Sequence, residues 1–329
     1  VYGARHVGLK AGLPVDVPAL TVNRLCGSGI QAAVSGAQLI LLGEADVVLT
    51  GGTESMSQAP HVIRGLRNGL RLGQGQLEDT LWSALLDTHC GCTMAATAEN
   101  CAATYGVTRD EQDQYAMRSQ QLAARAWAEG RLREEVVPVD IKSRKGAETF
   151  AEDDHMRPDS TLEALAKLPA AFSRNGCVTA GNASGIVDGG AALVLASEKG
   201  VRAHGLTPIA RLVHWASVGV DPALMGMGPA PATRRVLEQA GLSLKEVDLI
   251  EVNEAFAAQY LSVEKELGLD RDRVNVNGGA IALGHPLGMT GTRLLLTLTL
   301  ELRRRGLKRG LATACIGGGQ GIAAIVEAV

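Results

Sequence analysis

The stretch Pro18-Ala-Leu-Thr-Val-Asn-Arg-Leu-Cys-Gly-Ser-Gly29 decides the fold class, because it joins a strand pattern to a glycine loop and a helix start. Residues 18–22 are mostly apolar and predict a short buried strand. Beyond the loop, apolar residues recur at helical spacing as far as Gly43: Ile30, Val34, Ala37 and Leu41. Residues 47–50 predict the next strand, which runs into Gly51-Gly52. This order is typical of a parallel α/β sheet.

The same order returns near the C-terminus. Residues 273–277 predict a strand that leads into a glycine-rich loop at 278–288, and residues 290–305 predict a helix. Residues 311–316 predict a further strand, which ends in Gly317-Gly318-Gly319. Two copies of one unit predict an internally duplicated α/β protein with its site between the copies. Chance similarity of two such units is the alternative interpretation.

Residues 58–183 interrupt the pattern with helical stretches such as Arg109–Ala128. Residues 191–195 then predict a strand that rejoins the first domain, and Leu249–Val252 predicts a strand followed by a helix at 254–267 with Asn253 as its N-cap. We therefore expect three parts: an N-terminal domain from residues 1–57 and 184–207, an inserted loop domain at 58–183, and a C-terminal domain at 208–329.

Composition favours a small-molecule substrate. The chain has 329 residues, 32 Lys and Arg against 35 Asp and Glu, and 3% aromatic residues, so no basic field or stacking surface for nucleic acid is expected. The six cysteines are scattered, which fits a reducing compartment rather than a disulfide scaffold. His89-Cys90-Gly91-Cys92 lacks a second ligand pair, so no metal site is expected. No apolar run is long enough to predict a membrane span.

Three residues in glycine loops carry the chemistry. Cys26 lies at a helix start, where free N–H groups and the helix dipole are expected to lower a thiol pKa. His285 lies between glycines, and Cys315 directly precedes Ile316-Gly317-Gly318-Gly319, whose N–H groups suit an oxyanion. Each has a structural alternative: a packed thiol, a structural histidine, a simple turn. Together they predict acyl transfer through a thioester.

The chain resembles the thiolases in six separated blocks along its whole length: 23–29 (NRLCGSG), 51–57 (GGTESMS), 181–185 (GNASG), 253–256 (NEAF), 277–288 (NGGAIALGHPLG) and 315–321 (CIGGGQG). The wording of residues 4–9 and of the first block is most similar to the 3-ketoacyl-CoA thiolases of mitochondrial fatty-acid oxidation and their bacterial relatives. The resemblance implies a thiolase fold: two duplicated α/β domains in a five-layered α-β-α-β-α arrangement, plus an inserted loop domain.

The resemblance implies an acetyl-CoA acyltransferase, which cleaves 3-ketoacyl-CoA, acetoacetyl-CoA included, with CoA or runs the reverse Claisen condensation. Cys26 matches the nucleophile and Cys315 the acid/base. His285 matches the group that activates Cys26 and, with a water held by Asn253, stabilises the substrate enolate. The N–H groups of Cys26 and Gly317 match a second oxyanion hole.

The resemblance also implies a CoA site without a permanently bound cofactor. Ser184 matches a pantetheine contact, and Arg157 lies near the nucleotide phosphates. The residues implied to line the tunnel are Ala180, Leu85, Met94, Phe172 and Phe256. The alternatives are ordinary core packing for the apolar residues and a solvated surface charge for Arg157.

Two departures from the family pattern qualify the resemblance. Thr93 stands where many short-chain biosynthetic thiolases have a histidine, which favours a broader 3-ketoacyl range. About sixty N-terminal residues of the family, including its first strands, have no counterpart, and a sheet without internal strands would expose apolar edges.

Three other functions compete with a thiolase. A decarboxylating ketoacyl synthase would pair its nucleophile with two histidines or His and Asn, not with Cys315. A non-catalytic acyl-CoA or lipid-binding protein would have no need of all four reactive residues. A dinucleotide-binding oxidoreductase would need a glycine at Ala32.

Assembly and location follow only from the family. It implies a homodimer or homotetramer, in the cytoplasm if the source is bacterial, with the mitochondrial matrix as the alternative. Chain-length preference, physiological direction, source organism and any targeting peptide stay open.

Overall fold

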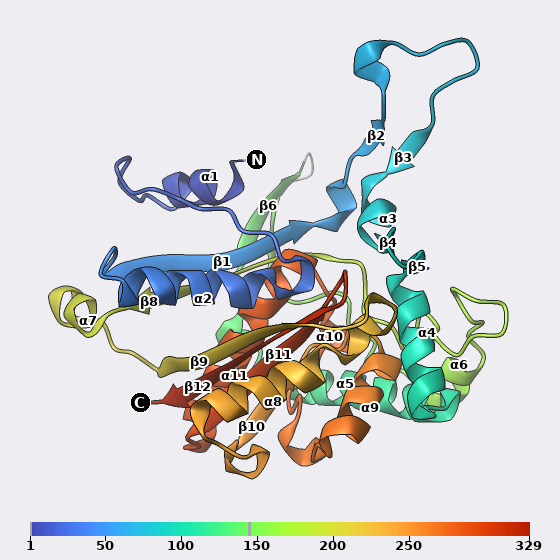
Figure 1. Cartoon of the computed structure of the whole chain (residues 1–329). Helices are drawn as coiled ribbons and strands as arrows, with labels where there is room; N and C mark the ends of the chain where they lie inside the picture. The colour runs from blue at the N-terminus through green and yellow to red at the C-terminus, as the bar shows by residue number, and fades with distance from the viewer. Residues whose placement is uncertain (1, 144–145) are drawn as a thin grey trace.

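Two β-sheets enclose a pair of helices in the computed structural model, which describes residues 2–143 and 146–329 (Figure 1). The first sheet is the antiparallel pair β1 (Val47–Ser55) and β8 (Asp188–Ala196). The second has the order β10-β11-β12-β9, with bounds Leu249–Val252, Arg309–Ile316, Gln320–Ala328 and Ala210–Gly219. Helices α2 (Ser28–Leu41) and α11 (Leu287–Arg305) lie between the sheets.

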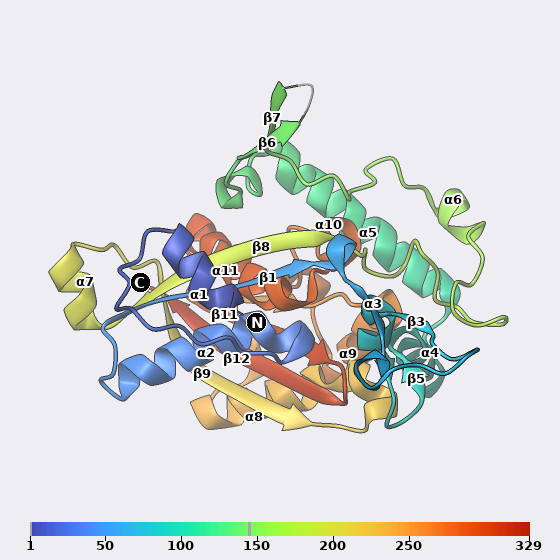
Figure 2. The ribbon, with the colours of Figure 1, turned by 90° about the horizontal axis from the view of Figure 1, so that it is seen from above.

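The outer layers complete the five-layered α-β-α-β-α arrangement. Helix α8 (Pro229–Ala240) packs on β9 and β12, on the face of the second sheet away from α2. The short helix α1 (Gly3–Lys10) lies beyond the outer side of β1 (Figures 1 and 2). Helix α7 (Glu198–His204) connects β8 to β9, and α9 (Ala257–Leu267) and α10 (Ala280–Leu283) flank the loops that carry the predicted site. The predicted α/β architecture is confirmed.

The duplication is visible in the packing of the two halves. Helix α2 precedes β1, which pairs antiparallel with β8, just as α11 precedes β11, which pairs antiparallel with β12. Within the described residues, β1 and β8 lack the flanking strands that β10 and β9 supply to β11 and β12. Val47, Leu49 and Val194 are exposed on this smaller sheet, as expected for a sheet without its neighbours.

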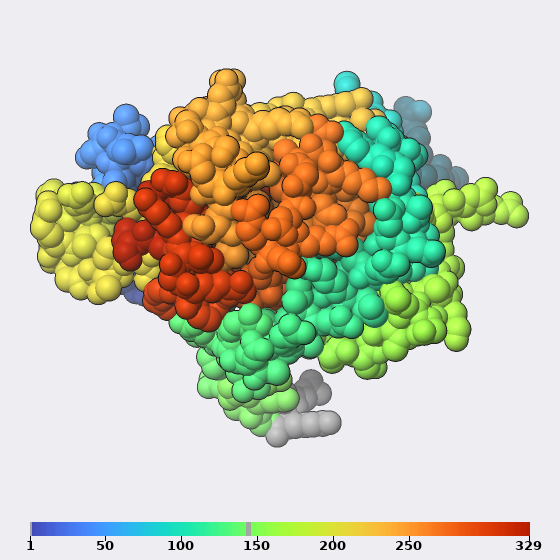
Figure 3. Space-filling view, turned by 90° about the horizontal axis from the view of Figure 1, so that it is seen from below, coloured from blue at the N-terminus to red at the C-terminus, as the bar shows by residue number. Residues whose placement is uncertain are grey.

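The inserted residues form a helical platform and a projecting arm. Helices α4 (Met94–Tyr105) and α5 (Arg109–Ala128) pack against α9, and in Figure 3 they form one continuous surface with the C-terminal half. The arm, β2 (His61–Ile63) and β3 (Leu77–Asp79), extends away from the body (Figure 1). The smaller elements are α3 (Thr80–Ala84), β4 (Leu86–Asp87), β5 (Cys92–Thr93), β6 (Val139–Ser143), β7 (Gly146–Phe150) and α6 (Leu162–Ala166).

Most predicted elements are confirmed, and four predictions are wrong. Residues 18–22 form no strand, because no strand among the described residues pairs with them. Residues 273–277 make only isolated bridges, because Asn275 adopts a φ of 48°. Asn253 does not cap a helix: α9 begins at Ala257, with Phe256 at its N-cap position. The sheet that contains β1 was predicted to be parallel, but β1 and β8 are antiparallel. Strands β10 and β11 form a parallel pair.

The central helices cross in close contact at two glycines. A Cβ atom on Gly29 would meet the backbone nitrogen of Thr292 and would lie 2.7 Å from its Oγ1. A Cβ on Gly291 would lie 2.5 Å from the backbone nitrogen of Ile30. Real Cβ atoms do not approach backbone this closely, so glycine is required on both helices. This contact fixes where α2 begins. Cys26 lies two residues before Ser28, the first residue of α2. In the described ranges no helix combines the length and apolarity that a membrane span requires.

Substituting Gly29 by Ala is expected to separate α2 from α11 and to destabilise the protein by about 1–3 kcal/mol, the usual cost of overpacking. Thermal unfolding of Gly29→Ala measures this as a lowered midpoint. The matched control is Gly3→Ala on α1, where a Cβ would meet no atom within 4 Å. Equal midpoints for Gly29→Ala and Gly3→Ala would show that the close crossing is not required.

Candidate active site

Cys26 lies in a short 3-10 turn, Leu25–Gly27, that leads directly into α2. Leu25 has a φ of 46°, a left-handed conformation that is costly for a residue with a Cβ. Side chains on both sides hold the turn: the Asn23 Oδ1 accepts the N–H of Leu25 at 2.9 Å, and the Ser28 hydroxyl donates to the Leu25 carbonyl at 2.7 Å. The strained turn points the thiol inward, so that only 8% of Cys26 is exposed.

Burial determines the electrostatics of Cys26. It raises the pKa of the thiol to about 11, although hydrogen bonds from the backbone N–H groups of Gly317 and Cys26 act to lower it, and Glu54 adds a small rise. The expected lowering by the helix start is therefore wrong for the free protein: desolvation outweighs the N–H groups. The two N–H groups that act to lower this pKa, those of Gly317 and Cys26, are nevertheless the two donors named from the sequence.

Cys315 lies near the end of β11 and is fully buried. Burial and the neighbouring thiol of Cys26 raise its pKa well above the usual value. Its side chain packs in an apolar cluster with Leu85, Met94 and Phe256. The structure therefore brings two neutral thiols and three of the predicted tunnel residues together.

His285 connects the loop before α11 to Asn253. The Asn253 Nδ2 lies 3.2 Å from the imidazole Nε2, and the Thr290 Oγ1 lies 2.6 Å from Nδ1. The Thr290 hydroxyl donates to the Pro286 carbonyl at 3.0 Å, so its oxygen is free to accept Nδ1–H. This arrangement makes Nε2 the acceptor nitrogen of His285, and the Asn253 Nδ2–H donates to it.

Burial and the charge of Arg293 lower the pKa of His285 to about 3, so the imidazole is neutral at physiological pH. The Oδ1 of Asn253 is buried and has no hydrogen-bond partner among the described residues. A water molecule is the simplest partner for such an atom. A water at this position would satisfy the unpaired Oδ1 of Asn253.

Backbone hydrogen bonds fasten the reactive loops to one another. The N–H of His285 donates to the Gly185 carbonyl at 3.0 Å, and the N–H of Ser184 donates to the Ala255 carbonyl at 3.0 Å. The Glu54 carboxylate accepts the N–H of Gly288 at 3.0 Å. The sequence did not single out Glu54 or Thr290. Thr290 could have been found as a hydroxyl five residues after His285, one turn into the following helix.

The other predicted CoA contacts are more dispersed. Ser184 adjoins the Ala255–Phe256 segment, whereas Ala180 and Phe172 are exposed. Arg157 is exposed as well, and its guanidinium donates to carbonyls of its own loop, those of Asp154, His155 and Met156. Of the predicted CoA contacts, the structure therefore brings Leu85, Met94 and Phe256 together. Ala180, Phe172 and Arg157 lie on the surface.

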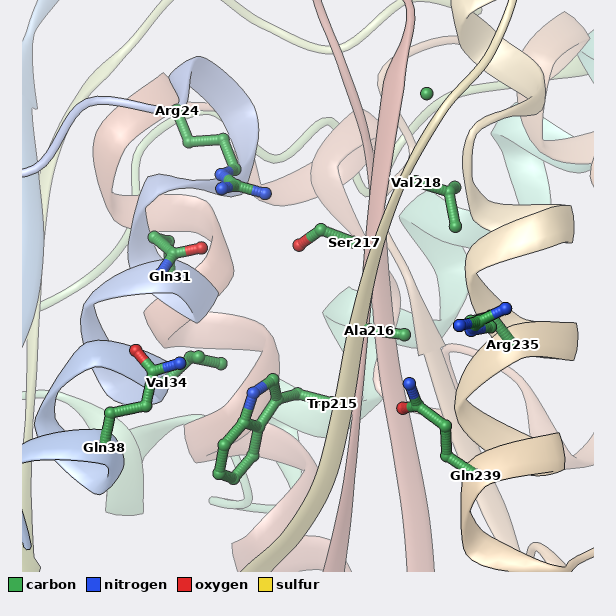
Figure 4. A pocket seen from close by; sticks show the side chains of 11 residues that line it. Arg24, Gln31, Val34, Gln38, Trp215, Ala216, Ser217, Val218, Arg235 and Gln239 are labelled. Atoms are coloured by element: carbon green, nitrogen blue, oxygen red, sulfur yellow. The ribbon is translucent and has the colours of Figure 1, made fainter. Parts of the chain in front are cut away.

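Two cavities lie in the body of the protein. One of about 230 Å³ is bordered by Met56, Leu81 and Leu287, which also cover Cys26. A larger groove of about 600 Å³ lies between α2, β9 and α8 (Figure 4), and it contains none of the reactive residues. Across residues 2–143 and 146–329, no group of three His, Cys, Asp or Glu side chains is placed to hold a metal ion.

The fold and the site define a class: an α/β protein that buries one cysteine near a second thiol, with two backbone N–H groups acting on its sulfur, and holds a buried neutral imidazole in the loop before α11. Cysteine-thioester chemistry requires groups of these kinds. A family model for the thiolase N-terminal domain matches residues 2–199, and one for the thiolase C-terminal domain matches residues 206–328. The chain belongs to the thiolase family.

Similar proteins agree with this membership. The chain is 54% identical over 328 residues to "3-ketoacyl-CoA thiolase, mitochondrial" of Homo sapiens, covering 99% of this chain and 83% of that protein. It is 55% identical over 326 residues to "Acetyl-CoA acetyltransferase" of Pseudomonas aeruginosa, covering 97% of this chain and 82% of that protein. A crystal structure of the human mitochondrial enzyme in complex with CoA aligns with a TM-score of 0.96 at 53% identity, covering 100% of this chain and 82% of that one.

The buried neutral His285 predicts a loss of stability in acid. Its pKa is about 3 in the folded protein and about 6.5 in the unfolded chain, so below pH 6.5 the unfolded state binds a proton that the folded state refuses. Stability should fall by about 1.4 kcal/mol per pH unit from this residue as pH drops from 6.5 toward 3. Urea unfolding of His285→Asn should show a shallower fall between pH 6.5 and 5 than the wild type.

His61→Asn is the matched control, because His61 is exposed on the arm and should leave the pH dependence of the wild type in place. If His285→Asn and the wild type lose the same stability over this range, His285 is not held neutral by burial.

Proposed function

We propose that this chain is an acetyl-CoA acyltransferase that cleaves 3-ketoacyl-CoA with CoA, reversibly, through a thioester on Cys26. The observation that carries the proposal is the pair of buried thiols, Cys26 and Cys315, in loops that also hold the backbone N–H groups of Cys26 and Gly317. The names of its relatives, 3-ketoacyl-CoA thiolase and acetyl-CoA acetyltransferase, support it, as does the solved relative with bound CoA.

In the first half-reaction, His285 Nε2 accepts the proton of the Cys26 thiol, and the sulfur attacks the 3-keto carbonyl carbon. The N–H groups of Cys26 and Gly317 stabilise the tetrahedral oxyanion. The C2–C3 bond breaks, and the electron pair becomes the enolate of acetyl-CoA, which His285 and an Asn253-held water stabilise. Cys315 gives its proton to C2, and acetyl-CoA leaves.

In the second half-reaction, the Cys315 thiolate takes the proton of an incoming CoA thiol. The CoA sulfur attacks the thioester carbonyl, the Cys26 sulfur leaves, and His285 returns its proton to it. The shortened acyl-CoA is released and both thiols are restored. Because the resting thiols are neutral, each proton transfer must accompany a bond change, which this order provides.

The CoA site is proposed to follow the apolar cluster at Cys315. Leu85, Met94 and Phe256 pack against that thiol and suit the pantetheine arm. Ser184 is proposed as a polar contact beside them, and Ala180, Phe172 and Arg157 as outer contacts toward the nucleotide, where exposure leaves room for a large ligand. No permanently bound cofactor is part of the proposal; CoA and acyl-CoA are substrates.

Domain organisation, assembly and location complete the proposal. We divide the chain into 1–57 with 184–207, 58–183, and 208–329. A homodimer or homotetramer is proposed, supported by exposed leucines on the arm: Leu66, Leu70, Leu72 and Leu77. The proposed location is the cytoplasm of a bacterium or, alternatively, the mitochondrial matrix, since the relatives include enzymes of both kinds.

Thiolysis is the direct test of activity. Adding CoA to acetoacetyl-CoA or 3-ketooctanoyl-CoA should remove the enolate absorbance, and comparing the two rates measures chain-length preference. Cys26→Ala and Cys315→Ala should each lose about 10³-fold or more in kcat/KM, because each thiol takes a bond-making or proton-transfer step. Cys101→Ala, a buried cysteine on α4 that has no proposed role, is the matched control.

No turnover with either substrate would contradict the proposed reaction. Full activity in Cys26→Ala would overturn the nucleophile, and full activity in Cys315→Ala would overturn the acid/base assignment. Release of CO2 from a malonyl thioester by the wild type would instead support a decarboxylating synthase.

The arm is expected to hold the assembly together. Replacing Leu66, Leu70 and Leu72 with Ser removes exposed apolar side chains without touching the body, so melting should be unchanged while the assembly falls to a smaller species. Sedimentation velocity measures this. An unchanged mass for the triple variant would remove the arm from the interface.

A further inference from the structure

A second pair of cysteines lies outside the proposed site. Cys90 and Cys92 belong to the tight hairpin between β4 and β5, in which Asp87 pairs with Cys92 and Leu86 with Thr93. The chain turns through residues 88–91, and the N–H of Gly91 donates to the Asp87 carbonyl at 2.8 Å. Neither thiol is used by the proposed reaction, and both side chains are half-buried at the surface.

The two cysteines lie close together at the turn. The Cys92 Sγ lies 3.7 Å from the Cys90 carbonyl oxygen, so the Cys92 thiol turns back toward Cys90. Residues two apart along a chain are at most about 7 Å apart at their Cα atoms, and a disulfide requires about 4.4–6.8 Å. Gly91 separates them with a φ of 70°, and the space around it is empty, so the backbone has room to adjust.

We propose that Cys90 and Cys92 are a redox-modification site, a dithiol that a low-molecular-weight disulfide of the glutathione class converts into an intramolecular disulfide. This goes beyond the proposed acyl transfer. The Cys90 thiol loses its proton to the solvent, and its sulfur attacks one sulfur of the external disulfide, which releases one thiolate and leaves a mixed disulfide. Cys92 then gives its proton to the released thiolate and attacks the Cys90 sulfur, which expels the second external thiolate, and this thiolate takes a proton from the solvent. One S–S bond forms, one breaks, and two external thiols result.

The order of the two cysteines follows from their surroundings. Burial, the Cys90 side chain and the carboxylate of Asp87 raise the pKa of Cys92, so Cys92 is the thiol that stays protonated and acts second. The Oδ1 of Asp87 accepts the N–H of His89 at 2.8 Å, while its Oδ2 is buried without a partner among the described residues. The negative charge of Asp87 therefore opposes the ionisation of Cys92.

The hairpin connects this modification to the acyl-transfer site. The N–H of Met94 donates to the Leu85 carbonyl at 2.8 Å, which closes the hairpin directly over the cluster at Cys315. The Thr93 hydroxyl caps α4 by accepting the N–H of Ala96 at 3.1 Å. A disulfide at the turn therefore pulls on Thr93 and Met94 together. We expect the oxidised form to be roughly tenfold less active, since small displacements of a positioning residue are costly.

The experiment measures oxidation first and activity second. The full chain is equilibrated with oxidised and reduced glutathione, alkylated and digested, and tryptic peptide 72–109 is weighed. The wild-type peptide should carry one alkyl group, on Cys101, which serves as an internal reference. Apart from that group, its mass should be about 2 Da below the mass of the reduced peptide, because the disulfide has lost two hydrogens. Cys92→Ser should retain a glutathione adduct on Cys90, because it cannot complete the second step, and Cys90→Ser should form its adduct more slowly, because Cys92 stays protonated.

The double variant Cys90→Ser/Cys92→Ser should keep the basal activity. It should lose the part of the inhibition by oxidised glutathione that depends on the two thiols. The inhibition that remains measures oxidation of Cys26. The mass shift does not require turnover, so it stands or fails independently of the acyl-transfer proposal. Two alkylatable thiols at 90 and 92 under a tenfold excess of oxidised glutathione would overturn the site. Equal inhibition of the wild type and the double variant would overturn its effect on activity.

Discussion

The close crossing of α2 and α11 at Gly29 and Gly291 is the contact on which the site depends. It sets the start of α2, and therefore the strained turn that points Cys26 inward. It also sets the start of α11, which carries His285 at its N-terminal side and Thr290 in its first turn. Because each helix belongs to one half of the duplicated fold, the crossing places reactive groups from both halves in one interior. A side chain at either glycine would move both loops.

Burial then determines the chemistry that this interior allows. Desolvation raises the pKa of both thiols and lowers that of His285, so the resting site is uncharged. Such a site holds no thiolate at rest. Negative charge forms only during the reaction, on the oxyanion, where N–H donors stabilise it. The backbone N–H groups of Cys26 and Gly317 are the donors proposed for that purpose. Neutrality at rest and stabilised charge during reaction are the expected properties of a thioester-forming enzyme.

Local patterns in the sequence predicted much of this structure. The α2, α5, α11, β10 and β11 elements lie where periodicity placed them, and the motif residues converge around Cys26 and Cys315. The failures share a cause, which is tertiary context. A strand at 18–22 needs a partner strand. The prediction of a lowered pKa for Cys26 left out the effect of burial. Asn253 faces His285 instead of capping a helix. The spacing of Thr290 from His285 is visible in the sequence, but the contact of its hydroxyl with the imidazole depends on the folded loop.

The central claim is that acyl groups pass through Cys26 and no other thiol. Incubation with acetyl-CoA, rapid acid quenching and peptide mass spectrometry locate the acyl group among the six cysteines. The account predicts an acetyl group on Cys26, formed in the wild type and in Cys315→Ala, and discharged when CoA is added. Acetyl on Cys315, or turnover in the wild type without any acetylated cysteine, would contradict it.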